Sequence, residues 1–170
     1  TDASDISNAY DGNDVITGGL GNDTINGGAG NNTYIFNLGD GSDFIASYYD
    51  PTSYLGSNLG KFNTISFGAG ITASSIDVYR SGSNLVLSII GTTDSITVEN
   101  FYRNDNHLET YNPVQQVTFS DGTVWNLDAF DDKAFTGNAT GETFYGTIDQ
   151  DNCKDMAGYY YYYSREVGNA

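Results

Sequence analysis

The sequence predicts an all-β protein in which a parallel β-roll is followed by an antiparallel β-meander or sandwich that caps it. A nine-residue repeat runs through residues 9–46, and a two-residue hydrophobic alternation begins at about residue 62. The composition agrees, because 21 glycines, only two prolines and 14 % aromatic residues are typical of a turn-rich β-protein. No amphipathic helix is expected.

The 170 residues suffice for one domain or two small ones. We expect four segments along the chain. They are the β-roll at 1–46, a loop at 47–61, an antiparallel β capping domain at 62–130, and a degenerate repeat with a tyrosine-rich tail at 131–170.

The roll is predicted from nonapeptides of the pattern G-G-x-G-x-D-x-U-x, where U is a large apolar residue. The copies read A-Y-D-G-N-D-V-I-T at 9–17, G-G-L-G-N-D-T-I-N at 18–26, G-G-A-G-N-N-T-Y-I at 27–35 and, after two extra residues, L-G-D-G-S-D-F-I-A at 38–46. Each copy is expected to form one turn and one short strand. The apolar position then faces a narrow core and is occupied by Ile16, Ile25, Tyr34 and Ile45.

Two nonapeptides make one coil of such a roll, so turns should stack only when they lie about 18 residues apart. One side should therefore stack Asp5, from a degraded earlier copy, under Asp23 and Asp43. The other side should stack Asp14 under Asn32, which weakens its own site because an amide removes one negative charge.

These turns carry the candidate metal ligands. Glycines at the second and fourth positions permit a backbone that curls around an ion, and the sixth position supplies a carboxylate. About six oxygen ligands suit a hard cation, which favours calcium over zinc or copper. The alternative is a run of ordinary turns, against which three in-phase copies argue. The candidate residues are Asp5, Asp11, Gly12, Asp14, Gly19, Gly21, Asp23, Gly28, Gly30, Asn32, Gly39, Asp40, Gly41 and Asp43.

On these residues, the block 9–46 resembles the repeats-in-toxin (RTX) family of haemolysin-type calcium-binding proteins. The run T-Y-I-F-N-L-G-D-G-S-D-F-I at 33–45 resembles the transition that follows the roll in that family. The resemblance implies a parallel β-roll, bound Ca²⁺, secretion by a type I pathway, and folding on contact with extracellular calcium.

The middle of the chain reads as strands separated by short turns at 81–83, 91–93 and 120–122. The expected strands are 62–67, 76–80, 84–90, 95–98, 114–119 and 123–125. Roughly 62–130 resembles the haemolysin-type calcium-binding protein related domain, whose expected role is to cover the open end of the roll. Four aromatic residues are assigned to packing in the core or the cap rather than to a ligand platform: Phe101, Tyr102, Phe119 and Trp125.

The C-terminal stretch repeats the nine-residue phase faintly at 137–145 and 146–154. Glu142 and Asp151 occupy the carboxylate position, and either metal binding or plain structural repetition is compatible with them. The run Tyr159 to Tyr163 could form a strand that packs on another subunit or a sugar, or a bland edge strand or tail.

The sequence also argues against several functions. A net charge of −16 disfavours nucleic acid and anionic membrane surfaces as partners. The single Cys153 permits neither an internal disulfide nor a paired-cysteine zinc site, and no apolar run is long enough for a membrane span. Motifs of the HExxH, GxSxG and GxxxxGK types are absent and His107 has no second histidine, so we expect no enzyme.

The leading functional hypothesis is a calcium-binding structural module of a secreted bacterial protein, located outside the cell or at its surface. Its partners would be calcium ions and adjoining domains of a longer chain. Two alternatives stay open at this point: a self-assembling extracellular fibre or surface-layer subunit, and a carbohydrate-binding accessory or adhesin module with a glycan ligand.

Overall fold

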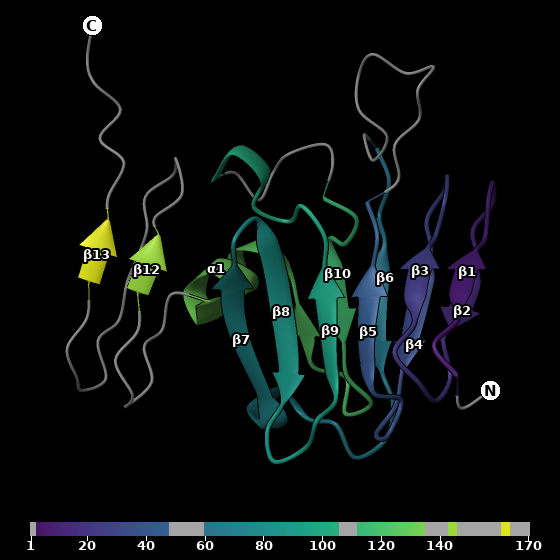
Figure 1. Cartoon of the computed structure of the whole chain (residues 1–170), viewed down its shortest axis with the longest axis horizontal. Coiled ribbons are helices and arrows are strands. Elements are labelled where there is room, and N and C mark those ends of the chain that lie inside the picture. The colour runs from purple at the N-terminus through teal and green to yellow at the C-terminus, as the bar shows by residue number, and fades with distance from the viewer. Residues whose placement is uncertain (1–2, 48–59, 106–111, 135–142, 146–160, 164–170) are drawn as a thin grey trace, which may run out of the picture.

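Two β-sheets face each other in the computed structural model, which describes residues 3–47, 60–105, 112–134, 143–145 and 161–163 (Figure 1). The first sheet has the strand order β1-β3-β5-β9-β8-β7 and the second has the order β11-β10-β6-β4-β2. The strands of the first sheet are β1 (Ile6–Asn8), β3 (Thr24–Asn26), β5 (Ser42–Ile45), β9 (Ser95–Val98), β8 (Asn84–Ile89) and β7 (Ile76–Ser81). Those of the second are β2 (Val15–Thr17), β4 (Thr33–Phe36), β6 (Thr64–Phe67), β10 (Gln116–Thr118) and β11 (Val124–Trp125).

The nonapeptides form the predicted roll, because successive strands alternate between the two sheets. The pairs β1–β3, β3–β5 and β2–β4 are all parallel. Ile6 lies opposite Thr24 and Val15 opposite Thr33, so one coil is two nonapeptides long, as predicted. The next coil is longer by the two extra residues, since Thr24 lies opposite Phe44.

The cap is less purely antiparallel than predicted. Strands β7, β8 and β9 form the expected antiparallel set, and β10–β11 is antiparallel as well. However, β6 pairs in parallel with β4, β10 with β6, and β9 with β5. The parallel sheets of the roll thus continue into the segment 62–130, which satisfies the backbone groups of β4 and β5. Alternating hydrophobicity could not reveal this, because it is shared by parallel and antiparallel strands that bury one face.

One helix was not expected. The eight-residue α1 (Leu127–Ala134) places Phe130 and Ala134 in the core, with 0 % and 5 % of their surfaces exposed. The side chain of Asn126 accepts a hydrogen bond from the backbone N–H of Ala129, which caps the first turn. Two turns of helix are too short for a clear periodic signal in the sequence.

The core lies between the two sheets and contains the residues assigned to it. Ile25, Tyr34 and Ile45 are each at most 3 % exposed, and Ile16 packs against the same cluster. The four aromatic residues of the cap, Phe101, Tyr102, Phe119 and Trp125, are buried too. The sequence assignment of both sets is confirmed.

Two further strands lie at the C-terminal side, β12 (Thr143–Tyr145) and β13 (Tyr161–Tyr163). They are parallel, and Thr143 lies opposite Tyr161, which is the same 18-residue offset as in the N-terminal roll. The predictions for His107, Glu142, Asp151 and Cys153 fall outside the described residues, as does most of the loop 47–61.

Candidate metal centre

The carboxylates of Asp5, Asp23 and Asp43 lie one above another, as a ladder, in the turns that lead into the strands of the first sheet. Oδ1 of Asp23 accepts the backbone N–H of Asp5 at 2.7 Å, and Oδ1 of Asp43 accepts the N–H of Asp23 at 3.0 Å. The three acids therefore stack in the predicted order. The carboxylates of Asp23 and Asp43 each use one oxygen to tie their turn to the turn below.

The second oxygen of Asp23 has no hydrogen-bond partner among the residues that the structure describes. Asp23 is 1 % exposed, and its Oδ2 is buried beside the backbone of Gly18, where an added Cβ would overlap it. Oδ2 of Asp14 is also buried and without a hydrogen bond. An ionised oxygen that has lost water and gained no donor is strongly unfavourable unless a cation neutralises it.

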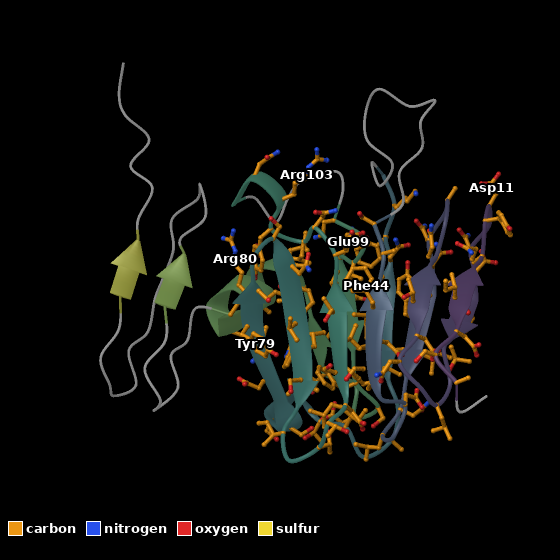
Figure 2. All side chains as sticks on the ribbon, viewed as in Figure 1. Asp11, Phe44, Tyr79, Arg80, Glu99 and Arg103 are labelled. Carbon is orange, nitrogen blue, oxygen red and sulfur yellow. The ribbon has the colours of Figure 1, made fainter. Side chains whose placement is uncertain are left out.

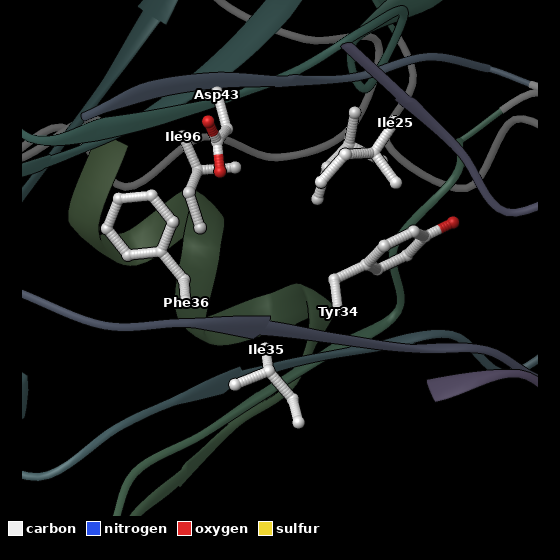
Figure 3. Close-up of a pocket in the computed structure, with 7 residues that line it drawn as sticks. Ile25, Tyr34, Ile35, Phe36, Asp43 and Ile96 are labelled. Carbon is white, nitrogen blue, oxygen red and sulfur yellow. The ribbon is translucent and has the colours of Figure 1, made fainter. Parts of the chain in front are cut away.

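Several carboxylates of the roll and the cap lie near Asp43. Burial, together with the charges of Asp23, Asp40 and Asp94, raises the pKa of Asp43 to about 6, although the hydrogen bond from the backbone N–H of Asp23 partly opposes the shift. Figure 3 shows the carboxylate directed into the interior, near Ile96. The small pocket there is lined by Ile25, Tyr34, Ile35, Phe36, Asp43, Ile45 and Ile96.

Asp94 was missed by the sequence analysis. It is 6 % exposed, and its Oδ2 accepts the backbone N–H of Gly39 at 2.7 Å, so it closes the last turn of the roll from a distant part of the chain. The run Asp94, Ser95 and Ile96 copies the Asp-x-apolar pattern of the repeat, and this was the available signal.

The two acids at the third position of their turns have different surroundings. Asp40 is 5 % exposed and its Oδ2 accepts the backbone N–H of Asn37 at 2.8 Å, so it stabilises its own turn. Asp11 is exposed at the outer end of the roll, near β1 and β2 (Figure 2). Asp11 is thus separated from the buried acids around Asp43.

The glycines have the conformations that the repeat predicts. All seven of the predicted turn glycines have positive φ: Gly12, Gly19, Gly21, Gly28, Gly30, Gly39 and Gly41. The requirement for glycine is strictest where turns stack, since a Cβ on Gly28 would overlap the carbonyl oxygen of Tyr10. A Cβ on Gly30 would likewise overlap that of Gly12. Backbone carbonyls therefore lie directly against the glycines of the next turn.

On the other side of the roll, the ladder is made of amides. Oδ1 of Asn32 accepts the N–H of Asp14 at 2.9 Å, and Oδ1 of Asn63 accepts the N–H of Asn32 at 2.7 Å. Oε1 of Gln115 accepts the N–H of Asn63 at 2.7 Å. The predicted stacking of Asp14 under Asn32 is present, and the cap extends it.

The residues fit a hard cation such as calcium, although not as a cluster of side chains alone. Within the described part of the chain, no three acidic, histidine or cysteine side chains converge on one point. Asp23 and Asp14 would each supply an unsatisfied carboxylate oxygen, and turn carbonyls would complete an all-oxygen shell of the kind that calcium accepts. A bound ion would supply the positive charge that these oxygens lack.

Comparison with known protein families agrees with this geometry. Residues 1–34 match the RTX calcium-binding nonapeptide repeat (4 copies), and residues 84–129 match the haemolysin-type calcium binding protein related domain. No curated protein matches the chain. Among the described residues, no helix is long and apolar enough to cross a membrane.

Proposed function

We propose that this chain, which carries RTX calcium-binding nonapeptide repeats and a haemolysin-type calcium binding protein related domain, is a calcium-dependent structural module of a secreted bacterial protein. RTX repeats bind calcium, and this chain is a calcium-binding module in that sense. The proposal adds that the module is non-catalytic, is exported, and completes its folding in the calcium outside the cell.

The observation that carries the proposal is the buried, unpartnered Oδ2 of Asp23. Together with Asp14, it gives the roll two buried carboxylate oxygens that no donor of the described residues satisfies. A cation that binds there stabilises only the folded state, because the unfolded chain does not bring the turns together.

The net charge of −16 makes this dependence stronger, since repulsion opposes compaction until cations neutralise part of it. At a free calcium concentration a few tens of times the Kd, one site contributes about 2 kcal/mol to folding. A few such sites are comparable with the whole stability of a small domain, about 5–15 kcal/mol. Low cytosolic calcium would then keep the roll unfolded for export.

The proposed ligands and domains follow the sequence analysis. Residues 1–46 would form the calcium-binding roll, 47–61 a loop, 62–130 the cap and 131–170 a degenerate repeat with a tail. Asp14 and Asp23 are the carboxylates best placed to meet an ion, and Asp5, Asp40 and Asp43 add negative charge near the second of them.

Self-assembly into a fibre or surface layer is a second candidate, favoured by exposed apolar side chains on strands that are terminal in their sheets among the described residues. β1 and β2 are terminal strands of their sheets, and Ile6 and Val15 on them are 78 % and 72 % exposed. Unpaired strand edges with apolar side chains promote association. Glycan binding stays a prediction.

The test is a calcium titration of the chain followed by circular dichroism and light scattering on the same sample. We expect a large gain of β signal between micromolar and millimolar calcium, reversed by chelator, with the mass of a monomer. A full β signal in chelator would contradict calcium-dependent folding. Growth in particle size that accompanies folding would instead support assembly.

A further inference from the structure

Two successive turns of the roll, 18–23 and 27–32, differ in the side chain that lies beside their first glycine. In turn 18–23 the side chain of Asp23 lies beside Gly18, and in turn 27–32 the side chain of Asn32 lies beside Gly27. Both are at the sixth position of their nonapeptide and both point back to the first. The same position is therefore occupied by a carboxylate in turn 18–23 and by an amide in turn 27–32.

The amide finds a partner where the carboxylate does not. Nδ2 of Asn32 donates a hydrogen bond to the carbonyl oxygen of Gly27 at 2.7 Å, whereas Oδ2 of Asp23 is buried and receives no hydrogen bond from the described part of the chain. An ionised carboxylate oxygen carries no hydrogen to donate to a carbonyl, so a cation at this place in turn 18–23 would supply the missing interaction. Turn 27–32 contains its own donor.

Turn 27–32 also receives a positive charge from the protein. Nζ of Lys61 donates a hydrogen bond to the carbonyl oxygen of Gly28 at 3.0 Å. Lys61 precedes β6, the strand that stacks on β4 in the next coil. An ammonium group on a turn carbonyl supplies the kind of interaction that a bound cation would otherwise supply.

Amide side chains also donate to backbone carbonyls in the next two residues of this ladder, Asn63 and Gln115. Nδ2 of Asn63 donates to the carbonyl oxygen of Pro113 at 2.8 Å, and Nε2 of Gln115 donates to that of Asn112 at 2.9 Å. Asn32 and Asn63 are 1 % and 2 % exposed, so these amides are buried and their acceptors and donors are both used.

We infer that turn 27–32 and the amide ladder Asn32–Asn63–Gln115 close without calcium, the amide of Asn32 and the ammonium of Lys61 replacing the ion. This inference rests on the proposed function, and it removes Gly28, Gly30 and Asn32 from the calcium ligands. Calcium control is then confined to the carboxylate ladder and to the turn of Asp14. On the amide side only the turn of Asp14 still needs the ion, because the turns stacked on it are closed by side chains.

The first test asks whether a site can be created. Asn32→Asp combined with Lys61→Met removes both substitutes for the ion and restores the carboxylate of the repeat. The matched control is Asn13→Asp with Lys61→Met. It changes the charge by the same amount but places the new carboxylate at an exposed position, where Oδ1 of Asn13 accepts the N–H of Asn31 at 2.8 Å.

We expect the Asn32→Asp pair to bind one more calcium ion per chain than the wild type in isothermal titration, and the control pair to bind no more. An unchanged count in the Asn32→Asp pair would overturn the inference. Calcium titration of the wild type tests the proposed function separately, because an absence of any binding there contradicts the calcium module.

The second test needs no variant. In chelator, hydrogen exchange should be at least tenfold slower at the backbone N–H groups of Asn32 and Asn63 than at those of Asp5 and Asp23. Calcium should slow only the second pair strongly. Equal exchange at both pairs in chelator would overturn the inference even if the chain binds calcium.

Discussion

Oδ1 of Asp23 accepts the backbone N–H of Asp5, 18 residues earlier, at 2.7 Å, while Oδ2 of the same carboxylate is buried with no partner within the described ranges. One side chain thus ties two coils together and leaves a charge to be neutralised. The stacking bond itself involves no ion, but the charge on the second oxygen makes the stack depend on a cation. The two oxygens of Asp23 therefore have different roles, one in stacking and one in binding a cation.

Asp23→Asn should stabilise the calcium-free chain and weaken its response to calcium. The amide keeps the acceptor for Asp5 and replaces the unpartnered oxygen with a donor, as in Asn32. Removing a buried unsatisfied group is worth about 1–3 kcal/mol. The measurement is urea unfolding in chelator and in millimolar calcium.

Asp121→Asn is the control for Asp23→Asn, since it removes the same charge from an exposed turn and retains the acceptor for the N–H of Thr123. It should leave the calcium response unchanged. A lower stability of Asp23→Asn in chelator, together with an undiminished calcium response, would contradict the role assigned to Oδ2.

The stability of the calcium-free chain should fall as the pH rises through about 6. The pKa of Asp43 is raised from 3.8 to about 6 in the folded state, so the folded state binds more protons than the unfolded state between these values. The loss of folding stability caused by ionisation of Asp43 is absent below about pH 3.8 and complete above about pH 6. It amounts to at most about 3 kcal/mol, and water that screens the site reduces it.

Denaturation in chelator between pH 4.5 and 7.5 measures this dependence. Asp43→Asn keeps the acceptor for the N–H of Asp23 and lacks the titrating group, so the difference between the two chains isolates Asp43. A difference that does not change with pH would show that Asp43 titrates normally. Calcium should reduce the difference above pH 6.

Gly28→Ala should be much more destabilising than Gly82→Ala. The two glycines have nearly the same φ, +67° and +62°, so the backbone cost of an alanine, about 1–2 kcal/mol, is shared. A Cβ on Gly28 overlaps the carbonyl oxygen of Tyr10, whereas a Cβ on Gly82 meets nothing within 4 Å. Thermal unfolding of both variants should separate them by about 1–3 kcal/mol or more. Equal losses would mean that the coils are not stacked this closely.

Tyr10→Gly should stabilise the chain. Tyr10 stands where the repeat has its second glycine, has φ +65°, and is 77 % exposed, so little packing is lost. Relief of about 1–2 kcal/mol of strain exceeds the entropic cost of a glycine, about 0.5–1 kcal/mol. Tyr79→Gly, in the extended backbone of β7, should destabilise in the same urea experiment. A loss at both positions would contradict strain at Tyr10.

The repeat made much of the site predictable, because a turn that recurs every nine residues places its sixth position on alternate sides of a roll. The stacking of Asp5, Asp23 and Asp43 and of Asp14 with Asn32 followed from that period. Asp94 and Lys61 did not, since they lie outside the repeat and reach it only when β9 and β6 add to the two sheets.

The sequence by itself determined the all-β fold, the roll, its narrow apolar core and the acidic turns, because each is encoded in a local period and in residue chemistry. Only the tertiary structure decided how the roll is closed. Parallel continuation into the cap and the stacking of Asn63 and Gln115 on Asn32 both depend on distant segments. Hydrogen bonds and desolvation are set by which groups meet in space, and a local pattern does not specify that.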